Sequence, residues 1–485
     1  MPFADPRDAR IAELERQLAE RDARIAELEK LLAAALARIA DLEAKLGQNS
    51  TNSSKPPSSD PPGTMRKLPK APSGRKPGGQ PGHPKREREL LPVDQVDKVV
   101  DLIPDRCGEC QRPLRGKDPT PQRHQLIEVP PVAPHVTEYR CHQLGCECGA
   151  TTRAELPPEA RSAWGERLNS IVALCTGEYR LSKRTTQQLL SDLLGVDIAL
   201  GSVSNIEQEV SAALAAPVEQ ARAFVKEQPI VNADETGWRE GKAAGKSLKA
   251  WLWTAVTPLV TVFLISRSRG KDAAKALLGE GFKGFLGTDR WSAYNWVDVI
   301  RRQLCWSHIT RDIQGFIDRG GVGARIGKSL MSQRNLMFKW WHRVRDGTLP
   351  RATFIRRMRR VEKNVGRLLR EAVVCAESKT AGMAKEMLKL EPALWTFVRV
   401  EGLEPTNNIS EQQVRCAVQW RKTSFGTQSP EGSRFVERIL SATATLRQQK
   451  RNVLEYLTAA CSAYRRGHSI PSLLPNGAHI ASLAA

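Results

Sequence analysis

Two aspartates end apolar runs that are separated by further strand-like and helical segments, and this order restricts the fold more than any other feature of the chain. Asp234 ends the run 229–234 and Asp289 ends the run 284–289. The hydrophobic pattern predicts, in chain order, strands over 229–236, 248–256 and 260–265, a helix over 271–278, and strands over 284–289 and 300–304. Strand, strand, strand, helix and strand is the order of a ribonuclease-H-like core, in which a mixed sheet presents its carboxylates along one edge.

A third carboxylate, Glu411, opens a later helical stretch. We expect it to lie in the first turn, with Ser410 as the capping residue. Two strand-end aspartates and one helical glutamate can converge on a pair of magnesium ions, because hard cations prefer carboxylate oxygens. Manganese is the alternative ion. Such ions activate a water or a 3′-hydroxyl and stabilise in-line displacement at phosphorus. Most of the 53 acidic residues only solvate a surface, so the order of the segments carries the prediction that Asp234, Asp289 and Glu411 form a phosphoryl-transfer site.

The charge of the chain favours a nucleic-acid partner. Its 74 Lys and Arg residues exceed its acidic residues by 21, and the excess is clustered, with a net charge of +13 over 319–370. This stretch lies between Asp289 and Glu411, so we interpret it as part of a basic helical insertion into the catalytic core. Its aromatic residues Phe338, Trp340 and Trp341 favour packing over stacking on unpaired bases.

The N-terminal segment has the pattern of a coiled coil. Apolar residues alternate in steps of three and four over five heptads, which predicts a parallel dimer rather than a lone helix docked on another domain. The residues expected at this seam include Leu14, Leu18, Ile25, Leu28, Leu32, Ile39 and Leu42. The Pro-, Gly- and Ser-rich segment that follows is either a DNA-tracking arm, with Arg75 and Lys76 in a minor groove, or a soluble tether.

Five cysteines in the next segment have the spacing of a structural zinc site. Four of Cys107, Cys110, Cys141, Cys146 and Cys148 would bind one tetrahedral zinc ion, and the sequence leaves the choice of four open. Two helical stretches follow, 183–194 and 202–214, with Ser202 expected to cap the second. They are consistent with a helix-turn-helix whose DNA-binding residues are Lys183, Arg184, Ser204 and Asn205, and equally with an ordinary helical hairpin.

The chain therefore divides into a multidomain α+β protein. The predicted units are a coiled coil (8–46), a basic linker (47–92), a zinc-binding module (93–157), a helix-turn-helix (165–216), a first part of the ribonuclease-H-like core (226–310), a basic helical insertion (311–400), a second part of the core with the catalytic helix (401–465) and a tail (466–485). The chain has no run of 18 apolar residues and no apolar signal region, so we expect a cytoplasmic, nucleoid-associated protein without a membrane partner.

Several short motifs resemble those of a bacterial transposase family, the insertion sequence sixty-six family. They cover nearly the whole chain: the zipper-like N-terminus, Asn-Ser-Ser-Lys-Pro-Pro-Ser-Ser-Asp at 52–60, Gly-Gly-Gln-Pro-Gly-His at 78–83, the cysteine segment, the paired helices, Ala233-Asp-Glu-Thr, Thr288-Asp289, Cys305-Trp-Ser-His308, and Asn407-Asn-Ile-Ser-Glu411 with Arg415. The resemblance implies that Asp234, Asp289 and Glu411 are an acidic triad, that magnesium is the cofactor, and that the terminal inverted repeats of an insertion sequence are the substrate.

Members of that family usually carry several basic residues after the Cys-Trp-x-His segment, whereas this chain has one, Arg311. Cys305 and His308 alone favour core filling over a metal site. Arg415 lies one turn beyond Glu411, where it can orient that carboxylate or contact a phosphate.

These features predict a transposase that hydrolyses the phosphodiester at the element ends and joins the 3′-hydroxyls to target DNA. Its partners would be DNA and a second copy of the chain, and the sequence leaves open whether companion proteins take part. The alternative from another class is a dimeric, zinc-containing DNA-binding regulator with a non-catalytic ribonuclease-H-like domain. A nuclease that cuts without joining would use the same site.

Overall fold

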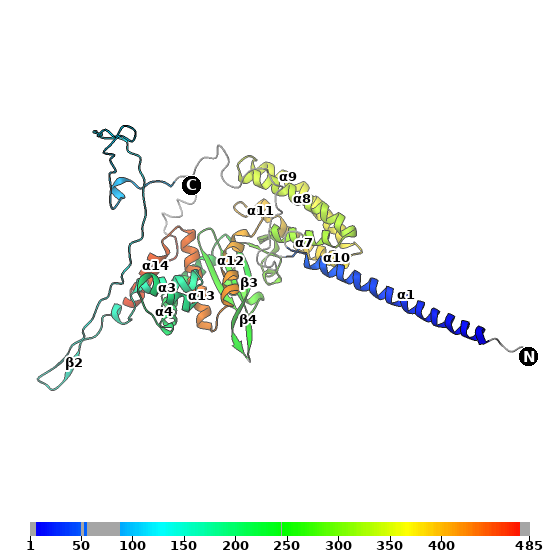
Figure 1. Ribbon diagram of the computed structural model, residues 1–485, viewed down its shortest axis with the longest axis horizontal. Coiled ribbons are helices and arrows are strands. Elements are labelled where there is room, and N and C mark those ends of the chain that lie inside the picture. Colours follow the sequence, from blue (N-terminus) through cyan, green and yellow to red (C-terminus); the bar gives the residue numbers. More distant parts are fainter. Residues whose placement is uncertain (1–5, 50–52, 56–87, 244, 476–485) are drawn as a thin grey trace, which may run out of the picture.

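The computed structural model describes residues 6–49, 53–55, 88–243 and 245–475 (Figure 1). Its centre is a five-stranded mixed sheet with the strand order β5-β4-β3-β6-β7. The strands are β3 (Ile230–Ala243), β4 (Lys246–Val256), β5 (Thr261–Ser266), β6 (Phe285–Thr288) and β7 (Arg302–Leu304), and α6 (Lys271–Leu278) precedes β6. The first three strands are antiparallel neighbours, whereas β6 and β7 run parallel to β3. The predicted mixed α+β class and the predicted order of strands and helix are confirmed.

Helices from both ends of this region cover the sheet. They are α2 (Glu166–Ala173), α3 (Lys183–Leu194), α4 (Leu200–Ala213), α5 (Ala215–Lys226), α12 (Asn408–Ser424), α13 (Pro430–Gln448) and α14 (Val453–Arg466). Their apolar faces share one hydrophobic core with β3, β4 and β5, in which Trp253 and Phe263 are fully buried. Residues far apart in the chain therefore stabilise one unit.

The helix α13 also closes the exposed edge of the sheet. Glu437, Ser441 and Thr445 are spaced one turn apart on α13, and they accept the backbone N–H groups of Ile265, Phe263 and Thr261. A helix therefore satisfies the donors that β5 would otherwise present to another chain.

A second hydrophobic core lies in the helical region between β7 and α12. The helices are α7 (Trp306–Asp318), α8 (Gly321–Arg345), α9 (Arg351–Val373), α10 (Ser378–Lys389) and the short α11 (Thr396–Arg399). Trp341 packs against Phe354 and Phe397, and its indole N–H donates to Glu404. The tryptophan side chain therefore packs the insertion, as expected.

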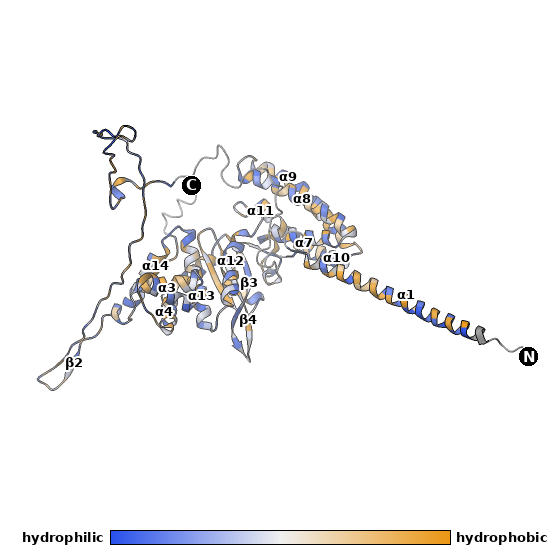
Figure 2. Ribbon diagram, in the orientation of Figure 1, coloured by the Kyte–Doolittle hydropathy of each residue, from blue (hydrophilic) through white to orange (hydrophobic). Residues whose placement is uncertain are grey.

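The helix α1 (Pro6–Leu46) projects away from the rest of the chain (Figure 1). Hydrophobic and hydrophilic residues alternate along this helix (Figure 2), and the residues of its predicted seam are about half exposed, Leu28 at 50% and Leu32 at 60%. The long helix is confirmed, and the pairing of two copies stays a prediction.

The segment from residue 88 to 157 contains no buried residue. It holds one short antiparallel pair, β1 (Gln143–Gly145) and β2 (Thr151–Arg153). Arg75 and Lys76 lie outside the described residues. Within the described part of the chain, none of the helices has the length and apolar character needed to cross a membrane. Short single turns complete the structure at 93–95, 158–160, 174–178, 292–294, 299–301 and 391–394.

Two predicted helix caps are wrong. Ser202 lies inside α4, which begins at Leu200, and Ser410 lies inside α12, which begins at Asn408. The Ser410 hydroxyl donates to the carbonyl of Asn407, so it does not accept one of the free N–H groups of the helix. Tertiary contacts at Asn407 set the start of α12, and a local cap preference is too weak to move it.

Candidate active site

Two parallel strands bring Asp234 and Asp289 to the same edge of the sheet. The register of β3 and β6 pairs Asn232 with Gly287. Asp234 lies two residues beyond Asn232 in β3, and Asp289 lies two residues beyond Gly287, directly after the end of β6. A Cβ atom at Gly287 would collide with the Asn232 side chain. Glycine at this position therefore allows the close approach of the two strands.

Glu411 reaches this edge from the first turn of α12. The buried side chain of Asn407, directly before the helix, donates from Nδ2 to the carbonyl of Ala233 at 2.8 Å. Ala233 precedes Asp234 in β3, so this hydrogen bond fixes the start of the helix beside the first aspartate. In the sequence, Asn407 stands out only as part of the motif before Glu411, and no local pattern indicates this role.

The three carboxylates influence one another electrostatically. Burial raises the pKa of Asp234 well above its usual value, and the negative charges of Glu235, Asp289 and Glu411 raise it further. Burial also raises the pKa of Glu411, whereas Arg311 and a hydrogen bond from Cys305 lower it. The hydrogen bond that Asp234 Oδ1 accepts comes from the backbone N–H of Glu235, 2.9 Å away. A buried carboxylate with acidic neighbours is a suitable ligand for a cation.

Residues around the aspartates hold the edge of the sheet in place. The Glu235 carboxylate accepts hydrogen bonds from Arg269 at 3.0 Å and from the Tyr294 hydroxyl at 2.8 Å. The fully buried Arg302 donates to the carbonyl of Asp289 at 3.3 Å, and burial lowers the pKa of its guanidinium to about 10. No sequence pattern marks these supporting residues, because only the folded sheet brings them to the aspartates.

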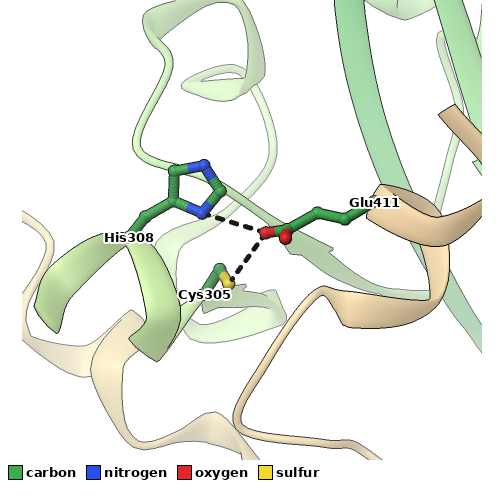
Figure 3. A group of neighbouring side chains, drawn as sticks. All are labelled: Cys305, His308 and Glu411. Carbon is green, nitrogen blue, oxygen red and sulfur yellow. Dashed lines mark hydrogen bonds and ion pairs between the residues drawn. The ribbon is translucent and has the colours of Figure 1, made fainter. Parts of the chain in front are cut away.

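Cys305 and His308 lie beside Glu411 (Figure 3). The Cys305 Sγ is 3.7 Å and the His308 Nδ1 is 3.3 Å from the same oxygen, Oε1, of Glu411. Burial raises the pKa of the Cys305 thiol to about 11, and the charge of Glu411 raises it too. Burial lowers the pKa of His308 to about 4, and Arg311 acts in the same direction. The imidazole is therefore neutral at physiological pH.

The three carboxylates do not have the spacing of ligands around a single ion in the described structure. Among the His, Cys, Asp and Glu residues in the described part of the chain, one group of three has its possible ligand atoms within 4.8 Å of one another, and it consists of Cys305, His308 and Glu411. The oxygens of Asp234, Asp289 and Glu411 are thus too far apart to surround a single ion. Two ions about 3.5–4 Å apart bridge a wider set of oxygens, and this all-oxygen donor set suits magnesium.

Four of the five cysteines of the predicted zinc module form two close pairs, Cys107 with Cys110 and Cys146 with Cys148. Backbone N–H groups of Cys110 and Glu109 lower the pKa of the Cys107 thiol, and those of Cys148 and Glu147 lower the pKa of the Cys146 thiol. Among the described residues, no three of the five sulfur atoms lie within 4.8 Å of one another. The zinc site therefore stays a prediction.

The residues predicted to contact DNA lie in different surroundings. Lys183 donates to Ser204 at 2.8 Å and forms a salt bridge of 2.7 Å with Glu207, so α3 and α4 are joined through two of the predicted residues. Arg184 and Asn205 are exposed. Arg415 is exposed too, and the described structure contains no ion pair between it and Glu411, although its charge lowers the pKa of that carboxylate.

The mixed sheet and the acidic side chains at its edge define an α+β protein with a candidate site for divalent cations. Comparison with protein families gives a more specific result: the model of the Transposase IS66 family matches residues 161–434, more than half of the chain. The chain therefore belongs to the IS66 transposase family. Residues 5–89 match a family of unknown function, DUF6444. No curated protein matches the chain significantly. Family membership implies a DNA-processing enzyme that binds DNA.

Proposed function

We propose that this transposase cleaves the ends of its insertion sequence and joins the released 3′-hydroxyls to target DNA at a site formed by Asp234, Asp289 and Glu411. The observation that supports the proposal is the convergence of these three carboxylates at the edge of a ribonuclease-H-like sheet, where their charges raise the pKa of Asp234. Asp234 would contact both magnesium ions, and Asp289 and Glu411 would each contact one. When bound, the ions lower the pKa of the attacking water and neutralise charge at phosphorus.

The residues of the chain set the geometry for this chemistry. Asn407 holds the helix of Glu411 against β3, and Arg302 supports the backbone at Asp289 from the buried side. Arg311 and Arg415 both lower the pKa of Glu411, so their positive charges lie near enough to receive the phosphate backbone of DNA. The basic helices α8 and α9 extend this positive surface.

Incubation of the protein with magnesium and a labelled element end tests the proposal. Hydrolysis together with a joined product supports a transposase, hydrolysis alone a nuclease, and binding alone the DNA-binding regulator. Asp234→Asn should lower cleavage by about a thousand-fold or more, because metal ions supply several kcal/mol of transition-state stabilisation, and it should leave DNA binding in place. Asp272→Asn, the same substitution at an exposed position of α6, is the control. A fully active Asp234→Asn enzyme would disprove the site.

A further inference from the structure

The group formed by Cys305, His308 and Glu411 has a donor set that differs from that of the acidic site. A thiol sulfur, an imidazole nitrogen and a carboxylate oxygen lie within 4.8 Å of one another. Magnesium binds sulfur and nitrogen poorly, whereas zinc prefers this combination of ligands. The two parts of the group come from distant segments, the start of α7 and the first turn of α12.

The distances within the group match those of ligands around a tetrahedral zinc ion. Bonds of about 2.0–2.3 Å at a tetrahedral angle separate nitrogen from oxygen by about 3.3 Å and sulfur from oxygen by about 3.5 Å. The observed separations from Glu411 Oε1 are 3.3 Å to His308 Nδ1 and 3.7 Å to Cys305 Sγ. Both separations are therefore compatible with a single zinc ion between the three side chains.

Two further contacts prepare the ligands. The buried Nδ1 atom of His308 has no hydrogen-bond partner although it faces a carboxylate oxygen, an arrangement that is unfavourable unless a proton or a cation lies between them. The backbone N–H of Asn407 donates to Cys305 Sγ at 3.2 Å, and Cys305 directly precedes the N-terminus of α7. Both features favour a thiolate, the form of cysteine that binds metal, and so oppose the effect of burial on this thiol.

We propose that Cys305, His308 and Glu411 bind one zinc ion, with the fourth position open to solvent. His308 and Glu411 are partly exposed, so a water molecule can reach that position, as in zinc sites with three protein ligands. This site is separate from the cysteine segment 107–148 and shares Glu411 with the proposed magnesium site. Zinc bound here withdraws Glu411 from Asp234 and Asp289 and so inhibits cleavage, a consequence that rests on the proposed function.

Zinc stoichiometry of the full-length protein tests the site. After equilibrium dialysis against zinc, His308→Ala and Cys305→Ser should each retain one equivalent fewer per chain than the wild type. Matched controls are His342→Ala, an exposed histidine of α8, and Cys375→Ser, a partly buried thiol outside the group. The cysteine segment is intact in all variants, so its zinc cancels in the difference. Because Cys305 is buried, the partly exposed His308 decides the test if Cys305→Ser does not fold.

An unchanged stoichiometry in His308→Ala would overturn the zinc site. The second measurement is inhibition of magnesium-supported cleavage by added zinc, expressed relative to the zinc-free rate of each protein. We expect at least about a tenfold higher zinc concentration for half-inhibition in His308→Ala than in wild type, since a lost metal ligand or its support costs about 10–100-fold in affinity. If His308→Ala retains one zinc fewer than the wild type but the wild type does not cleave DNA, the proposed function fails and the zinc site stands.

Discussion

At the scale of single residues, the negative charge of Asp234 is unfavourably placed. Burial and the acidic groups around this partly buried side chain raise the pKa of its carboxylate well above the usual value. The neighbouring carboxylate of Glu235 has Arg269 and Tyr294 as partners. Among the described residues, the hydrogen bond that the Asp234 carboxylate accepts comes from the backbone N–H of Glu235. These features support the proposal that Asp234 binds a cation.

Replacing Asp234 by Asn should stabilise the metal-free protein near neutral pH. Between the usual carboxyl pKa and the raised value, the folded wild type holds a proton on Asp234 that the unfolded chain has lost. Folding stability therefore falls as the pH rises through this range. Asn keeps the hydrogen bond from Glu235 and carries no charge. We expect a higher Tm for Asp234→Asn in chelator at pH 7.5, and a difference that shrinks as the pH is lowered toward 4.

Magnesium should reverse this order. It should raise the Tm of the wild type, because it binds only the folded protein, and raise the Tm of Asp234→Asn much less. Thermal unfolding with and without magnesium gives both comparisons, with Asp272→Asn as the control. A metal-free Asp234→Asn protein that is less stable than the wild type would mean that the carboxylate has a favourable partner after all.

A second residue-scale prediction concerns Asn407. Its Nδ2 group positions the helix of Glu411 and does not contact substrate, so Asn407→Ala should lower kcat by about 10–100-fold, the effect of losing 1–3 kcal/mol from a buried hydrogen bond. KM for DNA should change little. The exposed neighbour Asn408 provides the control Asn408→Ala. Steady-state cleavage kinetics separate the two parameters, and an effect confined to KM would contradict a positioning role.

At the scale of elements, the edge of β5 depends on α13. The Glu437 side chain is 2% exposed, and it accepts the Ile265 N–H at 2.6 Å and an Arg222 guanidinium at 3.2 Å. Glu437→Ala leaves a buried backbone donor and a partly buried arginine without this partner. We expect a loss of about 3–5 kcal/mol in the free energy of unfolding, measured by urea denaturation. As a control, Glu280→Ala removes a carboxylate that is 81% exposed and should change stability by less than about 1 kcal/mol. Equal losses of stability in Glu437→Ala and Glu280→Ala would exclude the proposed edge contact.

Local pattern predicted the elements of this fold well and their mutual contacts poorly. The apolar runs that end at Asp234 and Asp289 correctly predicted where β3 and β6 begin, although β3 continues to Ala243, beyond the predicted end at 236. The convergence of Cys305 with Glu411 was not predicted, because the two residues are 106 positions apart and meet only once α7 and α12 are docked. The wrong cap at Ser410 has the same cause, since the contact of Asn407 with β3 sets the start of α12.

At the scale of the whole molecule, the candidate site and much of the positive charge lie on different parts of the fold. The sheet supplies the carboxylates, whereas the helices between β7 and α12 supply much of the basic surface. The segment from 88 to 157 has no buried residue, so it has no apolar core of its own. The predicted zinc ion would supply the stabilisation that such a core gives to other segments.

The exposed apolar stripe of α1 leads to the last prediction, which concerns assembly. A 41-residue helix with half-exposed Leu28 and Leu32 on one narrow stripe gains stability by pairing with a second copy. The double variant Leu28→Glu, Leu32→Glu places like charges in that seam and should convert a dimer into a monomer over at least a tenfold range of concentration. Ala23→Glu, Ala37→Glu adds the same charge on the outer face of the helix and should remain dimeric. Sedimentation equilibrium measures both masses, and a wild-type monomer at all concentrations would show that the stripe docks elsewhere.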